Sequence, residues 1–294
     1  MKNIVRHTAT ITLAALIMSG CNNKQQTQTA IPETSDSVQS TVKDRSELPS
    51  SQLTVKNITK SKKNEVGEFE LSFDFPENGN ATLVNAIREY ISESLGTCYG
   101  GGEDNSKQGS YNGDLADGEK MADYYFSLKL KEFEEMNSTM KEDGAPEIPP
   151  LASSTKITKD YETDKVVTFL FKSYENAGGA HGGSVGSGMS FRKSDGRRIG
   201  WELFTATGMQ SVIRNGLKEY FEVKTDEELE GCLTLNDTFV IPMPVTPPLF
   251  GKDGIIVTYQ QYEIAAYAAG MPSFTIPYDK AKGMMNQTGK NLLP

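Results

Sequence analysis

Apolar residues in the first part of the folded chain alternate with polar ones and then recur every three or four positions. Leu53–Ile58 and Phe69–Phe75 follow the period of two typical of a half-buried strand, because successive side chains of a strand point to opposite faces. Pro76 ends the second run. Residues 80–95 then place their apolar side chains at helical spacing, and Asn80 is suited to cap the helix. The pattern predicts two strands and an amphipathic helix.

More helices and strands are expected further along the chain. Apolar residues from Ala122 to Phe133 predict a second helix, and the Pro- and Gly-containing residues 142–150 predict a break. Two strands are expected around a turn at residues 162–164, and Val166–Phe171 has the β-branched and aromatic residues of a buried strand. The remaining predictions are a strand from Met189, a hairpin turn at Asp195-Gly196, a helix over 209–221, a short helix with a capping box of Thr225 and Glu228, strands at Thr238–Ile241 and Ile255–Tyr259, and an edge strand at Phe274–Tyr278.

These elements come in clusters rather than in strict alternation of strand and helix. Such clustering favours an α+β fold with a mainly antiparallel sheet and packed helices. We expect an N-terminal α+β region over residues 51–150 and a C-terminal α+β domain over residues 151–294, with the two halves closely associated.

The N-terminus has the pattern of an export signal. Residues 1–20 combine Lys2 and Arg6 with an apolar stretch that is too short to span a membrane. Their ending, Met-Ser-Gly before Cys21, resembles a bacterial lipobox, so we expect lipidation at Cys21 and attachment to a membrane of the cell envelope, facing the periplasm or the cell surface. An ordinary signal peptide with a chance cysteine is the alternative. Residues 21–50 are rich in Gln, Thr and Ser and predict a flexible tether.

Charge and cysteine content narrow the possible partners. The net charge of −9 would become −11 after loss of residues 1–20, which hold two bases and no acid. This balance argues against nucleic acid as a partner and suits a cationic protein, although solubility alone would also account for it. Beyond Cys21 only Cys98 and Cys232 remain. In an oxidising compartment they are candidates for a disulfide, but the sequence leaves the pairing open.

Residues 176–188, NAGGAHGGSVGSG, hold six glycines and the one histidine beyond residue 20. A phosphate loop is excluded because no lysine lies between Lys172 and Lys193, and the glycine order does not fit a dinucleotide fingerprint. Residues 182–186 match G-x-S-x-G, but the nucleophile elbow requires a histidine after its serine, whereas His181 precedes Ser184. Too few Cys and His residues are present for a zinc site. We therefore expect a tight turn with a structural His181, and neither metal nor cofactor. A calcium site built from carboxylates alone is the alternative.

Three motifs in sequence order resemble a known family. They are YENAGGAHG at residues 174–182, followed by the DGR turn and Leu203-Phe204; VTYQQYEIAAYAAG at 257–270; and FTIPY at 274–278. Together they resemble a bacterial extracytoplasmic domain family of unknown function, which includes the lysozyme-binding ectodomain of the anti-sigma-V factor and non-catalytic domains of peptidoglycan deacetylases. Val257 and Ala266 depart from the family pattern, which has Phe and Pro there.

The resemblance implies an α+β ectodomain at the cell envelope and does not imply catalysis. The leading hypothesis is a non-catalytic binding protein. Candidate binding residues are His181, Tyr259, Tyr262, Glu263 and Tyr267, since tyrosines suit both interfaces and sugar stacking. Core packing of the same tyrosines is the alternative. The partner expected first is a cationic protein such as lysozyme. A protein that binds or processes peptidoglycan or another carbohydrate, and a structural or sensory lipoprotein, are the other two hypotheses.

Overall fold

The computed structural model describes residues 52–99, 110–144, 149–235 and 240–294. The signal peptide, the tether and lipidation at Cys21 are predictions that lie outside these residues, as does most of the strand expected at Thr238–Ile241. None of the helices within the described ranges is long and apolar enough to cross a membrane.

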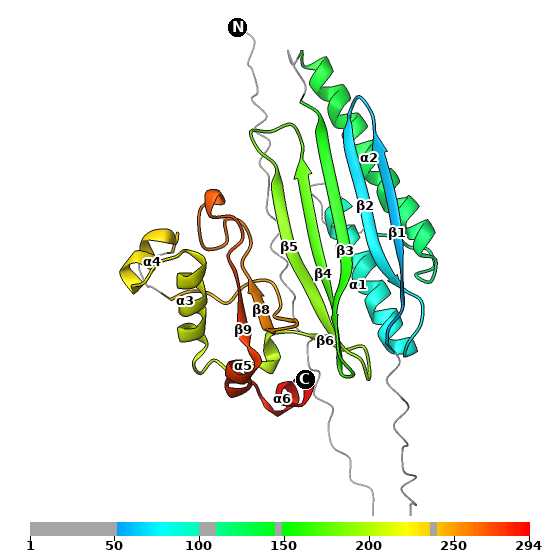
Figure 1. Ribbon diagram of the computed structural model, residues 1–294. Coiled ribbons are helices and arrows are strands. Elements are labelled where there is room, and N and C mark those ends of the chain that lie inside the picture. Colours follow the sequence, from blue (N-terminus) through cyan, green and yellow to red (C-terminus); the bar gives the residue numbers. More distant parts are fainter. Residues whose placement is uncertain (1–51, 100–109, 145–148, 236–239) are drawn as a thin grey trace, which may run out of the picture. The chain divides into compact units, whose positions relative to one another are not determined.

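The first layer is a sheet of six strands in sequence order, as Figure 1 shows. All neighbouring pairs are antiparallel except β2 and β3, which run parallel and join the region before residue 150 to the region after it. The α+β class and the mainly antiparallel sheet are thus confirmed. The strands are β1 (Val55–Lys63), β2 (Gly67–Pro76), β3 (Leu151–Glu162), β4 (Val166–Asn176), β5 (Gly183–Arg192) and β6 (Arg198–Ile199).

Two helices, α1 (Ala81–Tyr99) and α2 (Gly118–Glu142), cover one face of this sheet (Figure 1). The alternation in β2 sends Phe69, Leu71 and Phe73 to the helical side, where all three are buried. As expected, Asn80 caps α1, and its side chain accepts a hydrogen bond from the backbone N–H of Thr82 at 2.9 Å. The core between this sheet and its helices therefore forms from short-range patterns that the sequence displays.

The edge strand β1 is protected from pairing with another chain by its lysines. Lys60 Nζ lies 2.8 Å from Asp123 Oδ1 of α2, and Lys56 Nζ lies 2.9 Å from Glu119 Oε1 of the same helix. Charged side chains on an edge strand oppose the addition of a further strand. These ion pairs are exposed, so each contributes little to stability.

A second, three-stranded antiparallel sheet lies in the C-terminal part, in the order β7 (Leu249–Phe250), β8 (Gly254–Thr258) and β9 (Ser273–Pro277). The edge position expected for the last strand is confirmed. The two sheets meet through hydrogen bonds: Thr168 Oγ1 donates to Phe250 O at 2.7 Å, and Phe250 N donates to Ser190 Oγ at 2.9 Å. Buried polar groups need such partners, and here they lock the sheets together.

Helices α3 (Met209–Tyr220) and α4 (Asp226–Cys232) follow the sequence prediction, and the capping box of Thr225 and Glu228 is present in full. The short helices α5 (Tyr278–Met284) and α6 (Gln287–Leu292) were not predicted. The glycine stretch also differs from expectation. Only residues 177–182 form the turn, because the strand β5 begins at Gly183 rather than at Met189.

The start of the folded body is held by a buried carboxylate. Glu162 Oε1 accepts hydrogen bonds from Leu53 N at 2.8 Å and from Lys193 Nζ at 2.6 Å, while its Oε2 lies 3.0 Å from Lys159 Nζ. Burial opposes ionisation of this carboxyl, but the Lys193, Leu53 and Lys159 donors outweigh that effect and lower its pKa. The network ties Leu53 and Lys193, which lie 109 and 31 residues away, to one side chain of β3.

We expect Glu162→Gln to lower the free energy of unfolding at pH 7 by about 2–4 kcal/mol, because Lys159 and Lys193 lose their shared counter-charge. The lowered pKa of Glu162 means that its contribution is present above the pKa of the unfolded chain and is lost as the pH falls through the folded-state value. Urea unfolding of both proteins should therefore show a difference at pH 7 that shrinks in acid. Glu119→Gln, at an exposed ion pair, should change stability by less than about 1 kcal/mol. An equal effect of both substitutions would contradict the prediction.

Candidate functional site

The turn between β4 and β5 carries His181 at its exposed tip. Gly182, the next residue, is buried beneath Tyr174: a Cβ atom at this position would lie 2.4 Å from the tyrosine hydroxyl oxygen. The glycine therefore makes room for Tyr174, which is 40% exposed. His181 Nδ1 lies 3.1 Å from Gly182 O, which agrees with a histidine that orders the turn.

The first half of β5 has a free edge, because β6 pairs only with Ser190 and Phe191. Two glutamines from the loop after β8 cover it. Gln261 Oε1 accepts a hydrogen bond from Ser184 N at 2.9 Å. Gln260 accepts from Gly186 N at 3.2 Å and donates from Nε2 to Gly186 O at 2.5 Å. These side-chain amides replace the neighbouring strand and bring the loop against the glycine-rich strand.

Three of the five predicted site residues meet at this junction. The rings of His181 and Tyr267 are stacked, with centroids 4.0 Å apart and an angle of 25° between the planes. Tyr262 lies beside Tyr267 at a centroid distance of 5.6 Å. The hydroxyl of Tyr267 donates to Gly182 O at 2.7 Å, so this ring is held from both sides. The result is a surface row of three rings, which we name the aromatic row.

Tyr262 is the more accessible of the two tyrosines in the row, with 57% of its surface exposed. Its backbone adopts φ 65°, a left-handed conformation that bulky residues rarely adopt. The conformation turns Tyr262 outward while its neighbours on both sides bond to the protein. A strained residue that presents a large side chain to solvent is a feature of functional sites.

Tyr259 and Glu263, the other two predicted site residues, serve the structure. Tyr259 is fully buried and donates to Pro242 O at 2.8 Å. Glu263 accepts from Val245 N at 2.8 Å and from Gln260 N at 2.7 Å. Burial raises the pKa of the Glu263 carboxyl, and the two backbone donors offset part of this effect. The carboxylate thus joins two loops beneath the aromatic row.

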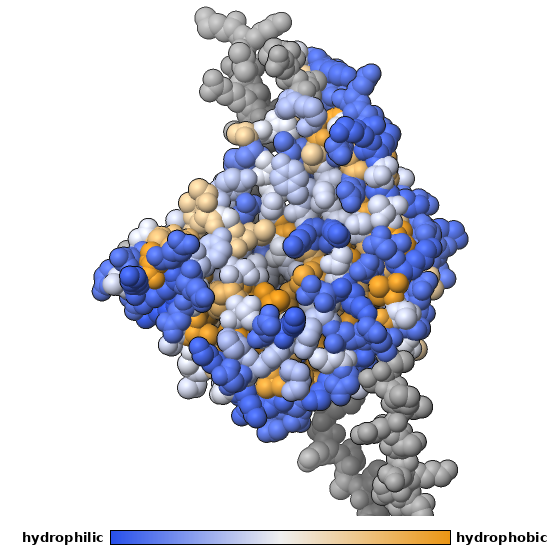
Figure 2. Space-filling view, viewed as in Figure 1, coloured by the Kyte–Doolittle hydropathy of each residue, from blue (hydrophilic) through white to orange (hydrophobic). Residues whose placement is uncertain are grey.

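Exposed large apolar side chains gather in the segments around this junction. Val245, which is 68% exposed, is one of the two residues whose backbone N–H donates to Glu263, and the Tyr220 hydroxyl donates to Ala269 O at 2.7 Å. In Figure 2 the loop between β8 and β9 forms a pale orange surface beside mostly blue neighbours. The most exposed members among the described residues are Tyr174, Val185, Tyr220, Val240, Met243, Val245 and Tyr262, and none of them precedes β4.

Clustered metal ligands and paired cysteines are both absent from the described part of the chain. No group of three or more His, Cys, Asp or Glu side chains there is arranged to hold a metal ion. Cys98 and Cys232 are free cysteines, so the structure shows no disulfide between them. Burial raises the pKa of the Cys98 thiol to about 11, which keeps it protonated and unreactive at neutral pH.

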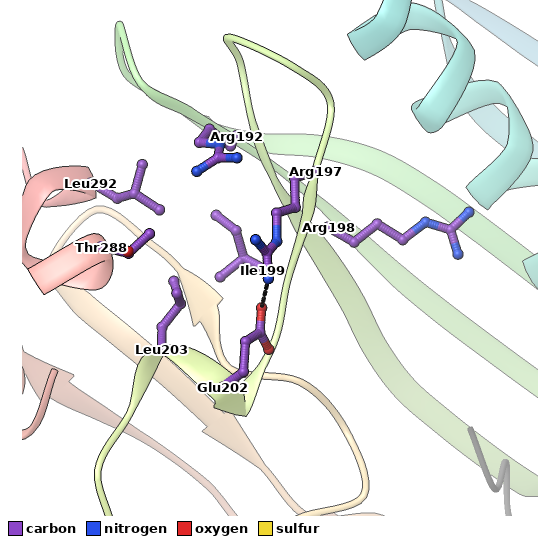
Figure 3. Close-up of a pocket in the computed structure, with 8 residues that line it drawn as sticks. All are labelled: Arg192, Arg197, Arg198, Ile199, Glu202, Leu203, Thr288 and Leu292. Carbon is purple, nitrogen blue, oxygen red and sulfur yellow. Dashed lines mark ion pairs between the residues drawn. The ribbon is translucent and has the colours of Figure 1, made fainter. Parts of the chain in front are cut away.

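The pocket shown in Figure 3 is too small for an organic ligand. It lies between the hairpin of β5 and β6 and helix α6, and its volume of about 10 Å³ is roughly that of one water molecule. Arg192 and Arg197 point toward it, whereas Arg198 points away and pairs with Glu93 at 2.5 Å. The aromatic row is therefore the better candidate site.

Comparison with known proteins points to a family without an assigned function. Residues 208–279, from the start of α3 past the end of β9, match the family model "Protein of unknown function (DUF3298)". This match contains the loop with Tyr262 and Tyr267 and supports the resemblance to a family of unknown function. No curated protein matches the chain.

Two solved structures of DUF3298 proteins have a similar fold. A member from Bacteroides fragilis aligns over 80% of this chain and 94% of its own, with 16% identity and a TM-score of 0.57. A family protein from Pseudomonas aeruginosa aligns over 83% of this chain and 98% of its own, with 15% identity and a TM-score of 0.52. At these identities the likeness is one of fold alone.

Sequence reasoning missed Tyr174, Gln260 and Gln261. The sequence does carry a signal for β5, the strand to which the two glutamines bond. Residues 184, 186, 188 and 190 are all Ser or Gly, so one face of this strand has only small side chains. The glutamines themselves carry no such signal, because their partners lie 74 and 77 residues away.

We expect Gln260→Ala to lower the free energy of unfolding by about 1–3 kcal/mol, because Gly186 N and O lose their partner. Amide hydrogen exchange at Gly186 should accelerate at the same time. Gln287→Ala is the matched control, since its side chain bonds only to Asn291 on exposed α6. Unchanged exchange at Gly186 in the Gln260 variant would show that the glutamine does not hold this edge.

Proposed function

We propose that this chain is a non-catalytic cell-envelope lipoprotein whose folded body binds a partner through the aromatic row. The observation that carries the proposal is Tyr262, an exposed ring in a left-handed backbone conformation beside the stacked His181 and Tyr267. Tyrosine is enriched at the centres of protein interfaces, where it buries a large area with little loss of side-chain entropy.

The class of partner follows from charge and ring chemistry. A net charge of −9 favours a cationic protein over nucleic acid, and lysozyme is the specific candidate that the sequence resemblance suggests. The match to a family of unknown function leaves that candidate as a proposal. The exposed ring of Tyr262 also suits the apolar face of a sugar, so a peptidoglycan glycan is the second candidate.

Attachment to the membrane is the other half of the proposal. Cys21 would carry the lipid, and residues 21–50 would connect it to Leu53, where the Glu162 network holds the start of the folded body.

Metabolic labelling with palmitate tests the anchor. We expect the wild-type chain to be labelled and to fractionate with membranes, and Cys21→Ser to lose both properties. Cys98→Ser is the matched control and should keep the label, because that thiol lies buried in the body. Labelling of the Cys21 variant would end the lipoprotein proposal without affecting the binding proposal.

Binding to immobilised lysozyme, measured at low and high salt, tests the aromatic row. We expect Tyr262→Ala to weaken binding by about 30-fold or more, as loss of an interface hot spot does. Retention should also fall with rising salt, because the long-range attraction is screened. Lys131→Ala, on the exposed face of α2, should bind as the wild type does.

The results separate the two candidate partners. Absence of wild-type retention at low salt would exclude lysozyme. Equal binding of wild type and Tyr262→Ala would exclude the aromatic row as the site. If lysozyme fails, the same two proteins are titrated with soluble peptidoglycan fragments, and a loss of glycan binding in Tyr262→Ala supports the second candidate.

A further inference from the structure

A separate surface depression lies where the start of α2 meets β1, β2 and α1. Its volume of about 500 Å³ falls within the range of small-molecule sites. Ile58 of β1 and Phe75 of β2 form its apolar part. They pack directly against Gly118, where a Cβ atom would lie 2.7 Å from Ile58 Cδ1. The aromatic row contributes no residue to this depression.

Arg88 of α1 is the distinctive residue of this depression. Its guanidinium lies over the ring of Phe75, 4.7 Å from the centroid, and one nitrogen donates to Pro76 O at 3.1 Å. The Nε atom is buried and has no hydrogen-bond partner. An arginine held over a ring and bonded to a backbone carbonyl is already ordered, so its remaining guanidinium N–H groups are preorganised to receive a carboxylate.

Arg88 also differs from every other arginine of the described chain. It makes no ion pair there, whereas each of the others has a carboxylate within 4 Å. An unpaired arginine in a protein with an excess of acids indicates a position kept for an anionic group. The paired residues are Arg192 with Asp195, Arg197 with Glu202, Arg198 with Glu93, and Arg214 with Asp226.

Acidic residues at the edge of the depression, which we call its rim, supply negative charge opposite to that of Arg88. Glu77 and Asp114 line the depression and form no ion pair with a described residue. The other rim charges are already matched, since Lys56 pairs with Glu119 and Asp117 with Lys120. A ligand that meets the unmatched groups must carry both a negative and a positive charge.

We propose that this depression binds a small zwitterion, either an amino acid or the free ends of a short peptide. The carboxylate lies against the remaining N–H groups of Arg88, and the ammonium faces Glu77 and Asp114. This site is independent of the proposed function of the aromatic row.

Saturation-transfer NMR on the full chain, with alanyl-alanine as the probe, tests the proposal. We expect saturable transfer from the dipeptide. Its C-terminal amide should bind at least tenfold more weakly, because the charge-assisted bond to Arg88 is lost. The N-acetyl dipeptide should bind several-fold more weakly. Equal binding of the dipeptide and its amide, or absence of saturable transfer, would overturn the proposal.

Variants locate the binding. Arg88→Gln should reduce dipeptide affinity at least tenfold, whereas Arg198→Gln, at an arginine with its own carboxylate, should bind as the wild type does. Glu77→Gln serves as a second variant on the exposed rim if the Arg88 variant fails to fold, and it should weaken the dipeptide more than the N-acetyl form. Wild-type affinity in a folded Arg88→Gln protein, or an equal effect of Glu77→Gln on both ligands, would contradict the assignment.

Discussion

The free edge of β5 is the constraint on which the candidate site depends. A strand that loses its neighbour halfway along leaves backbone N–H and C=O groups without partners, and these must be satisfied. The chain satisfies them with two glutamine side chains rather than with another strand. Because Gln260 and Gln261 are followed at once by Tyr262, covering the edge also determines where the aromatic row lies.

The narrow outer face of β5 makes this arrangement sterically possible. Gly188 lies so close to the second sheet that a Cβ atom would be 2.8 Å from Leu249 Cδ1, and Gly186 lies against Met271. Larger side chains would hold the second sheet away from the first and separate the loop from the hairpin. The glycines thus allow close packing of the second sheet as well as the turn. Their role is to leave space, and they carry no reactive group.

The sequence reveals those elements whose signals are local. The alternation in β2, the caps of α1 and α4, and the Asp195-Gly196 turn all depend on residues within a few positions of one another. The parallel pairing of β2 with β3 depends on chain segments about 80 residues apart and has no local signal. Of the five residues chosen for the site, the structure exposes the aromatic row and turns Tyr259 and Glu263 inward. Spacing along the motif could not separate these two groups, because the backbone reverses at Tyr262.

Tyr262 combines a left-handed backbone, which favours glycine, with a large exposed side chain, which glycine lacks. A glycine there would adopt the same conformation without the steric penalty, which is on the order of 1 kcal/mol for a residue with a side chain. Selection for folding alone would therefore favour glycine at this position. A tyrosine in its place means that the chain gives up a fraction of its small margin of stability to present a ring to solvent. A loss of stability in return for an exposed ring is expected where selection acts on binding to another molecule as well as on folding.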